Sequence, residues 1–150
     1  NMPFLNVHLP LDELGRRIIV ETVDAHVATL DRTPVVQDAI DALLHLPEFA
    51  SATTRIIVPV GAPDRPLGRL AVVHGAGTNG GADIASAYFA HGIDTVLYIH
   101  CAGEEVAKLR ERGVGNLIVS GHIASDLVGI NPYVAAIEAR GVRVVRMSGL

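Results

Sequence analysis

The chain has 150 residues, a length that suits one ordinary domain with a substantial core. Apolar residues make up 49% and charged residues 19%, a composition that describes a globular protein and argues against a disordered one. A net charge of −4 with scattered arginines argues against a broad nucleic-acid surface, and the single cysteine, Cys101, excludes an internal disulfide framework and a cysteine-rich zinc finger.

The apolar runs and the amino-terminal residues bear on where the protein is located. The longest apolar runs, such as Val96 to Ile99, are far too short to span a bilayer. The amino-terminal residues lack the basic, apolar and small-residue zones of a signal peptide. We therefore expect a cytoplasmic protein without a membrane partner.

The amino-terminal part of the sequence predicts a strand followed by a helix. Residues 4–8 form a short β-like run, and Pro10 keeps the residue before it extended. Apolar residues from Ile19 to Leu30 recur every three or four positions, which is the spacing of one helical face. A first helix is therefore expected to begin near Asp12.

A second helix and a pair of strands are expected next. Thr33 has the residue type of an N-cap and Pro34 that of a first helical residue, and Pro47 marks the end of this helix. The runs 55–60 and 69–74 have the pattern of strands. Because the segment between them is rich in turn residues, an antiparallel hairpin is expected.

The second half of the chain alternates between helices and strands. This order predicts parallel pairing with helices covering the sheet. We therefore expect an α/β fold in a single domain, residues 1–150, with a mixed, largely parallel sheet flanked by helices. The expected elements are helices at about 82–91, 102–112 and 122–128, a last helix capped by Asn131-Pro132 and running to about Arg140, and strands 94–99, 116–120 and 143–147.

Four of the β-like runs end in a histidine, and these residues are the strongest functional signal in the sequence. They are His8, His74, His100 and His122. In open α/β sheets, ligands bind beyond the carboxyl ends of the strands. The four histidines are therefore expected where an active site would be assembled.

Two of these histidines are followed by an aspartate four residues later. The pairs are His8 with Asp12 and His122 with Asp126, and residues four apart lie on the same face of a helix. Imidazole and carboxylate together form the ligand set of a zinc or transition-metal centre. These four side chains predict one centre for two divalent ions (Zn, Fe, Mn or Ni); the alternatives are an N-cap role for Asp12 and a solvated helix position for Asp126.

His74 and His100 have no aspartate at this spacing. They are candidates for a catalytic base, for further metal ligands or for residues that orient the ligands. The alternative is that each is a polar residue in the wall of a crevice. Cys101, next to His100, is expected to be a small buried residue.

A glycine-rich loop lies between a predicted strand and a predicted helix, which is the context of a phosphate-binding loop. Its spacing matches neither the Walker A pattern nor the dinucleotide fingerprint. Backbone N–H groups of such a loop would hold a substrate phosphate or oxyanion near the metals. The candidate residues are Gly75, Gly77, Thr78, Asn79, Gly80 and Gly81.

Three segments of the sequence resemble the carboxyl half of the NIF-three-like family, dinuclear-metal-centre proteins often labelled GTP cyclohydrolase type I-2 homologues. They are LAVVHGAGTNGGADI at 70–84, GIDTVLYI at 92–99 and GHIASD at 121–126. The family's closing motif is Gly-His and, after three further residues, an acid that is normally glutamate and is Asp126 here. Its middle motif, His-Thr-Asn-Leu-Asp, is matched at the two ligating positions by His8 and Asp12.

The resemblance implies a NIF-three-like fold, a metal-dependent hydrolase acting on a phosphate- or nucleotide-like small molecule, and assembly into trimers or hexamers. The family's His-His-Pro motif is absent. Either the chain lacks the family's amino-terminal portion, or it is a divergent member with an incomplete metal site. The competing functions are a non-catalytic, oligomeric metal-binding or interaction module with a degenerate site, and a binding protein that holds a small phosphate ligand through loop 75–81.

Overall fold

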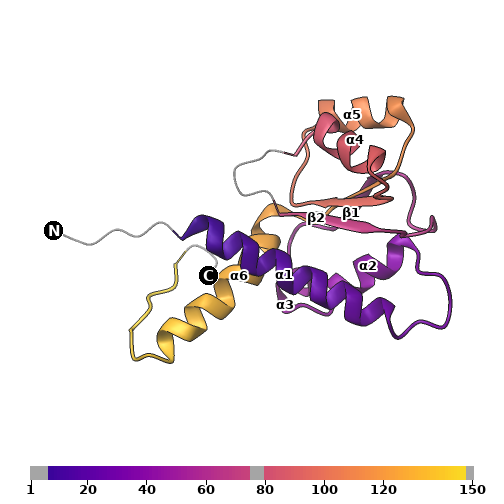
Figure 1. The fold of residues 1–150 in the computed structure, drawn as a ribbon. Helices are drawn as coiled ribbons and strands as arrows, with labels where there is room; N and C mark the ends of the chain where they lie inside the picture. The colour runs from indigo at the N-terminus through magenta and orange to yellow at the C-terminus, as the bar shows by residue number, and fades with distance from the viewer. Residues whose placement is uncertain (1–6, 75–79, 148–150) are drawn as a thin grey trace.

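The computed structural model describes residues 7–74 and 80–147 and shows a sheet between two groups of helices (Figure 1). The helices are α1 (His8–Val27), α2 (Val36–Leu43), α3 (Pro47–Ala50), α4 (Ala82–Ala90), α5 (Gly103–Arg112) and α6 (His122–Glu138). The strands are β1 (Ile57–Val60), β2 (Leu70–Val73), β3 (Thr95–Tyr98) and β4 (Asn116–Val119). The predicted α/β class, with a mixed and largely parallel sheet, is confirmed. Among the described residues, no helix combines the length and the apolar composition that a membrane span requires.

The four strands lie in the order β1-β4-β3-β2. Strands β2, β3 and β4 are parallel and in register, with Leu70 opposite Thr95 and Thr95 opposite Asn116, so their carboxyl ends meet at one edge of the sheet. Strand β1 pairs antiparallel with β4. The predicted β1–β2 hairpin is therefore wrong, because these two strands lie at opposite edges.

The segment between β1 and β2 makes hydrogen bonds to residues at the start of α2, and its turn at residues 62–65 does not pair the two strands. The backbone N–H of Val36 donates to the carbonyl of Arg65 at 2.9 Å, and that of Leu67 donates to the carbonyl of Pro34 at 2.9 Å. These bonds satisfy backbone groups at the start of α2 and carry the chain across to the far edge of the sheet.

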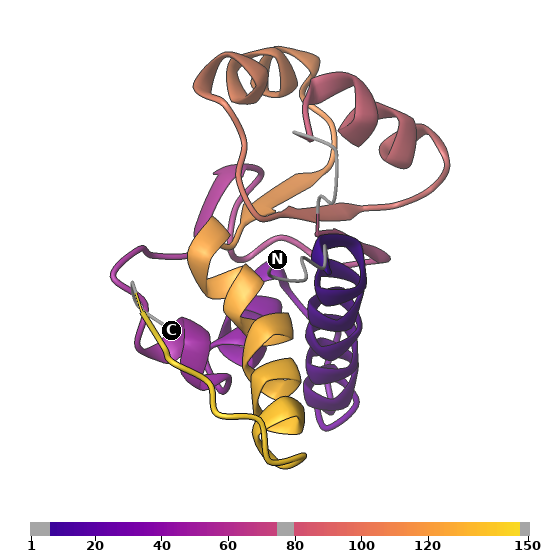
Figure 2. The same ribbon diagram turned by 90° about the vertical axis from the view of Figure 1, so that its left-hand side faces the viewer.

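Each face of the sheet has its own hydrophobic core, because successive strand residues point to opposite faces. Leu97 and Ile118 pack with residues of α1, α2 and α6, whereas Val96, Tyr98 and Leu117 pack with residues of α4 and α5. Strands β3 and β4 are buried on both faces, which is the usual situation for parallel strands. Figure 2 shows α4 and α5 above the sheet and α1 beside α6 below it.

The structure corrects the prediction for the amino-terminal segment. Residues 4–6 lie outside the described residues, but His8 is the first residue of α1 and not the end of a strand. Pro10 is tolerated in this first turn, where its missing N–H costs no helical hydrogen bond. Asp12 is therefore not the N-cap but a buried residue inside the helix.

The carboxyl-terminal predictions are also corrected. Helix α6 runs without a break through Pro132, so Asn131-Pro132 does not cap a separate helix. Residues 143–147 form no strand, and Val145 and Met147 are exposed. The end of α6 points away from the sheet, so the residues after it do not reach a strand with which to pair (Figure 1).

Helix α2 begins at Val36, two residues later than predicted. Its amino-terminal cap is the side chain of Asp38, which belongs to the first turn of the helix. A carboxylate oxygen of Asp38 accepts a hydrogen bond from the backbone N–H of Val35 at 2.7 Å. The guanidinium of Arg32 donates to both oxygens of the same carboxylate, at 2.8 and 2.6 Å. The predicted N-cap, Thr33, is not used, because Asp38 satisfies the free N–H group.

Helices α1 and α6 cross at two glycines. A Cβ added to Gly129 would lie 2.1 Å from the carbonyl oxygen of Leu11, and one added to Gly15 would lie 3.3 Å from the backbone nitrogen of Gly129. The two backbones can approach this closely only because neither position has a side chain.

We expect Asp38→Asn to lower the free energy of unfolding by about 1 kcal/mol at neutral pH, because charge-assisted hydrogen bonds are lost. The hydrogen bonds from Arg32 hold the pKa of Asp38 below its ordinary value. This stabilisation is present above the ordinary pKa of an aspartate and disappears as the pH falls through the lowered pKa of the folded protein. Urea unfolding at several pH values measures it, with the exposed Asp64→Asn as control. A difference that persists unchanged in strong acid would contradict this explanation.

We expect Gly129→Ala to destabilise the protein by about 1–3 kcal/mol, because the new methyl group forces α1 away from α6. Gly103→Ala is the matched control, since a Cβ there meets nothing within 4 Å. Thermal unfolding of the two variants makes the comparison. Equal stability of both variants would show that the helices do not depend on the glycine crossing.

Candidate metal centre

His74 follows β2 directly and is the most buried of the candidate histidines and aspartates. Its exposed fraction is 3%. Among the described residues, neither Nδ1 nor Nε2 of this ring has a hydrogen-bond partner. Buried polar atoms are almost always satisfied, so these two nitrogens are candidates for contact with a bound ion or water.

Two aspartates from facing helices approach His74. Asp12 comes from α1 and Asp126 from α6, each three residues before one of the glycines at the crossing. One ligand atom from each of Asp12, His74 and Asp126 lies within 4.8 Å of the other two, the one such group found in the described part of the chain. Nε2 of His74 lies 4.0 Å from Oδ1 of Asp126.

His8 and His122 lie on the solvent side of this group. Nε2 of His8 is 3.2 Å from Oδ2 of Asp12, and Nε2 of His122 is 3.4 Å from Oδ2 of Asp126. Their side chains are 66% and 53% exposed. Each predicted histidine–aspartate pair is thus in contact within one helical turn, and the aspartate of each pair lies close to His74.

His100 contacts the group through His122 and not through a carboxylate. The two imidazole rings stack with their centroids 5.1 Å apart and their planes 8° from parallel. Nδ1 of His100 is buried and lacks a hydrogen-bond partner in the described residues. The structure therefore brings all four predicted strand-end histidines to one place, three of them from the carboxyl ends of strands and His8 from the first turn of α1.

Burial sets the protonation of the central residues. It lowers the pKa of His74, against the opposing effect of Asp12 and Asp126. Burial also raises the pKa of Asp126, where His122 acts to lower the pKa and the nearby Asp12 acts to raise it. A neutral imidazole beside two carboxylates is a donor set that a cation would stabilise.

The turn into α6 places His122. Gly121 has φ of +99°, a conformation that favours glycine, and the hydroxyl of Ser125 donates to its carbonyl at 2.6 Å. This turn brings the first residue of α6 back over the ends of the strands.

A repeated spacing in the sequence could have revealed the arrangement. Both helices begin with the pattern His-x-x-x-Asp-x-x-Gly, from His8 to Gly15 and from His122 to Gly129. Sequence reasoning used the histidine–aspartate spacing but missed the glycines. A Cβ on Gly15 would lie 3.0 Å from Cε1 of His74, so this glycine also makes room for the buried imidazole.

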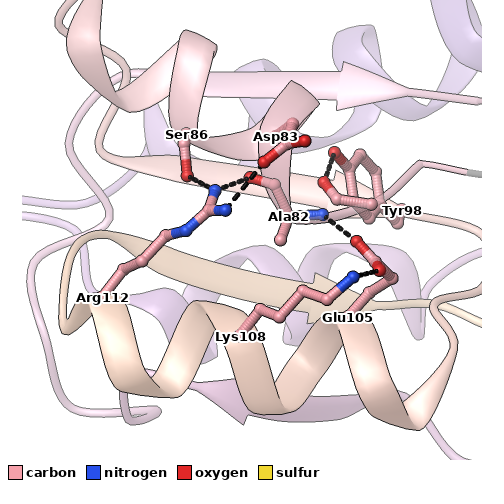
Figure 3. A network of polar contacts seen from close by, with 8 residues as sticks. Ala82, Asp83, Ser86, Tyr98, Glu105, Lys108 and Arg112 are labelled. Atoms are coloured by element: carbon pink, nitrogen blue, oxygen red, sulfur yellow. Dashed lines mark hydrogen bonds and ion pairs between the residues drawn. The ribbon is translucent and has the colours of Figure 1, made fainter.

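The glycine-rich loop is described only in part. Gly75, Gly77, Thr78 and Asn79 lie outside the described residues, and Gly80 and Gly81 lead into α4. The N–H of Ala82, at the start of α4, donates to Oε2 of Glu105 at 2.7 Å (Figure 3). Because a carboxylate already takes this donor, a phosphate bound there would meet a like charge. Phosphate binding by this loop stays a prediction.

Figure 3 shows the polar contacts around Glu105 and the start of α4. Lys108 pairs with its other oxygen, and Arg112 donates to Asp83 at 2.7 Å and to the hydroxyl of Ser86 at 2.6 Å. The phenol of Tyr98 donates to the carbonyl of Gly81 at 3.1 Å. These contacts fix α4 against α5 and serve the fold.

The chain matches no model of a known protein family and no curated protein sequence. Among solved structures, it is similar to a NIF3 superfamily protein from Sphaerobacter thermophilus, with 70% identity and a TM-score of 0.93. That match covers 99% of this chain and 54% of the other, so this chain spans about half of its relative's length.

A second solved structure is the Staphylococcus aureus protein SA1388, which has 20% identity and a TM-score of 0.45. The match covers 81% of this chain and 33% of that chain, a similarity too low to indicate function. The resemblance found in the sequence is confirmed by the first structure. The chain belongs to the NIF3 superfamily.

Proposed function

We propose that Asp12, His74 and Asp126 bind a divalent metal ion, and that His8 and His122 complete a site for two such ions. The proposed activity is hydrolysis of a phosphate- or nucleotide-like small molecule. The observation that supports it most strongly is the convergence of two carboxylates on a buried histidine whose ring nitrogens lack hydrogen-bond partners in the described residues.

The geometry of the three residues fits a metal ion. Zinc lies about 2.0–2.2 Å from nitrogen and oxygen donors, so two donors on one ion are at most about 4.4 Å apart. The ligand atoms here lie within 4.8 Å of one another, and a shift of a few tenths of an ångström would close the site. The imidazole and carboxylate donors suit Zn, Fe, Mn or Ni.

The position of the Asp126 carboxylate favours a second ion in the site. Its Oδ1 faces Nε2 of His74 at 4.0 Å, and its Oδ2 faces Nε2 of His122 at 3.4 Å. Asp126 would therefore supply one oxygen to an ion held with His74 and the other oxygen to an ion held with His122. Asp12 would serve the same arrangement, with its Oδ2 turned toward His8.

The site's chemistry follows from its placement. Bound divalent ions supply Lewis-acid polarisation of a phosphoryl oxygen and activate water for attack. The side chains of His8 and His122 lie at the exposed mouth, where a small substrate would enter, while His74 holds the buried end. We propose a cytoplasmic homo-oligomer, trimeric or hexameric by resemblance, which sedimentation would test.

Protein purified without chelators is expected to contain about two divalent ions per chain. Asp126→Asn is expected to weaken metal binding by about 100-fold, because the substitution removes the charge of a proposed ligand. Elemental analysis and metal titration measure both, with the exposed Asp64→Asn as the matched control. Absence of stoichiometric Zn, Fe, Mn or Ni from the unaltered protein would overturn the proposal.

Metal-loaded protein is expected to hydrolyse a phosphate ester such as p-nitrophenyl phosphate, and Asp126→Asn to lower the rate by about 100-fold. Far-ultraviolet circular dichroism would show that the variant is folded. Stoichiometric metal without turnover on phosphate monoesters and diesters would instead identify the non-catalytic module that the sequence leaves as the alternative.

A further inference from the structure

A cavity of about 380 Å³ lies beside the candidate metal centre. Helix α3 and the residues after it form one side, and the first turns of α6 form the other. His122 belongs to both the cavity wall and the metal centre, since its Nε2 is 3.4 Å from Oδ2 of Asp126. We call it the α3–α6 cavity.

The inner surface of the α3–α6 cavity is apolar. Ala52, Ala124 and Leu127 line it, and Ala124 is buried. Ile123, next to His122, also lines the cavity, although its side chain is 74% exposed. An apolar wall that leads from solvent toward a polar centre is typical of small-molecule sites.

Hydrogen-bond acceptors lie along the same cavity. Oε1 of Glu48 accepts a hydrogen bond from Nδ2 of Asn131 at 2.7 Å, which fixes the carboxylate between α3 and α6. Its second oxygen and the hydroxyls of Thr53 and Thr54 have no partner among the described residues. These groups can accept hydrogen bonds from a bound molecule.

The charge of the lining selects against an anion in the α3–α6 cavity. Within the described residues, Glu48 is the one carboxylate that lines the cavity, and no lysine or arginine does. An anionic group therefore has a favourable place only at the metals, and the cavity itself suits an uncharged group.

We propose that the α3–α6 cavity binds the organic part of the substrate, an uncharged ring with an apolar face and hydrogen-bond donors on its edge. A sugar and an amino-bearing heteroaromatic ring share this chemistry. The proposal deepens the proposed function and rests on it, because the anionic group of the same molecule would lie at the metal centre. Glu48 and the two threonines determine the specificity.

The first experiment tests the cavity without metal. Adenosine or methyl glucoside is added to protein treated with EDTA, and the methyl resonances of Ile123, Ala124 and Leu127 are followed by NMR. We expect these resonances to shift with at least one of the two probes, and the probe that binds identifies the kind of ring. Thr53→Trp fills the cavity mouth from an exposed position and is expected to weaken binding by about tenfold or more.

Two further variants make the result specific. Thr33→Trp, at an exposed position remote from the cavity, controls for the added ring and is expected to bind as the unaltered protein does. Glu48→Gln keeps the shape of the side chain and removes its charge, and is expected to weaken binding by several-fold. No methyl shifts with either probe, or equal weakening by Thr53→Trp and Thr33→Trp, would overturn the proposal.

The second experiment joins the cavity to the metal centre. Calorimetry on Zn²⁺-loaded protein compares inorganic phosphate with adenosine monophosphate and glucose 6-phosphate. We expect one ring-bearing phosphate to bind about tenfold more tightly than inorganic phosphate, and Thr53→Trp to abolish the difference without changing phosphate binding. Equal affinity for the three phosphates would overturn the cavity's role. If Zn²⁺-loaded protein binds no inorganic phosphate but the methyl shifts of the metal-free protein are still seen, the proposed function is overturned and the cavity proposal is not.

Discussion

The close crossing of α1 and α6 is the constraint on which the candidate site depends. The two helices come from opposite ends of the described chain, and their backbones meet where Gly15 faces Gly129. Each helix carries an aspartate three residues before its glycine, so the contact that packs the helices also brings Asp12 and Asp126 to His74. A side chain at either glycine would separate the helices and the ligands together.

That contact brings two carboxylates together beside a buried imidazole, which costs free energy unless a cation or proton compensates. The nearby histidines compensate in part, since His122 acts to lower the pKa of Asp126 while burial and Asp12 raise it. His74 cannot serve fully in this way, because burial lowers its pKa. A bound divalent ion would relieve both the carboxylate repulsion and the missing hydrogen bonds of His74.

Much of the site could be predicted because parallel strands end at one edge of a sheet. This rule is sufficient to predict that His74, His100 and His122 lie together. It gave the wrong reason for His8, which begins a helix, and the alternative N-cap role for Asp12 was wrong, because Asp12 lies inside that helix. Strand periodicity also could not reveal that β1 and β2 lie at opposite edges, because the hydrogen bonds between the intervening segment and the start of α2 are long-range contacts that a strand pattern does not contain. The central place of His74 depends on helix packing, which strand patterns do not encode.

The central claim is that Asp12, His74 and Asp126 bind a metal ion, and anomalous X-ray diffraction tests it most directly. Crystals of protein purified without chelators would be measured on both sides of the absorption edge of the metal identified in solution. We predict an anomalous peak about 2.0–2.2 Å from Nε2 of His74 and from a carboxylate oxygen of each aspartate. Fully metal-loaded protein with no peak between these three residues, or with its peak elsewhere, would contradict the claim.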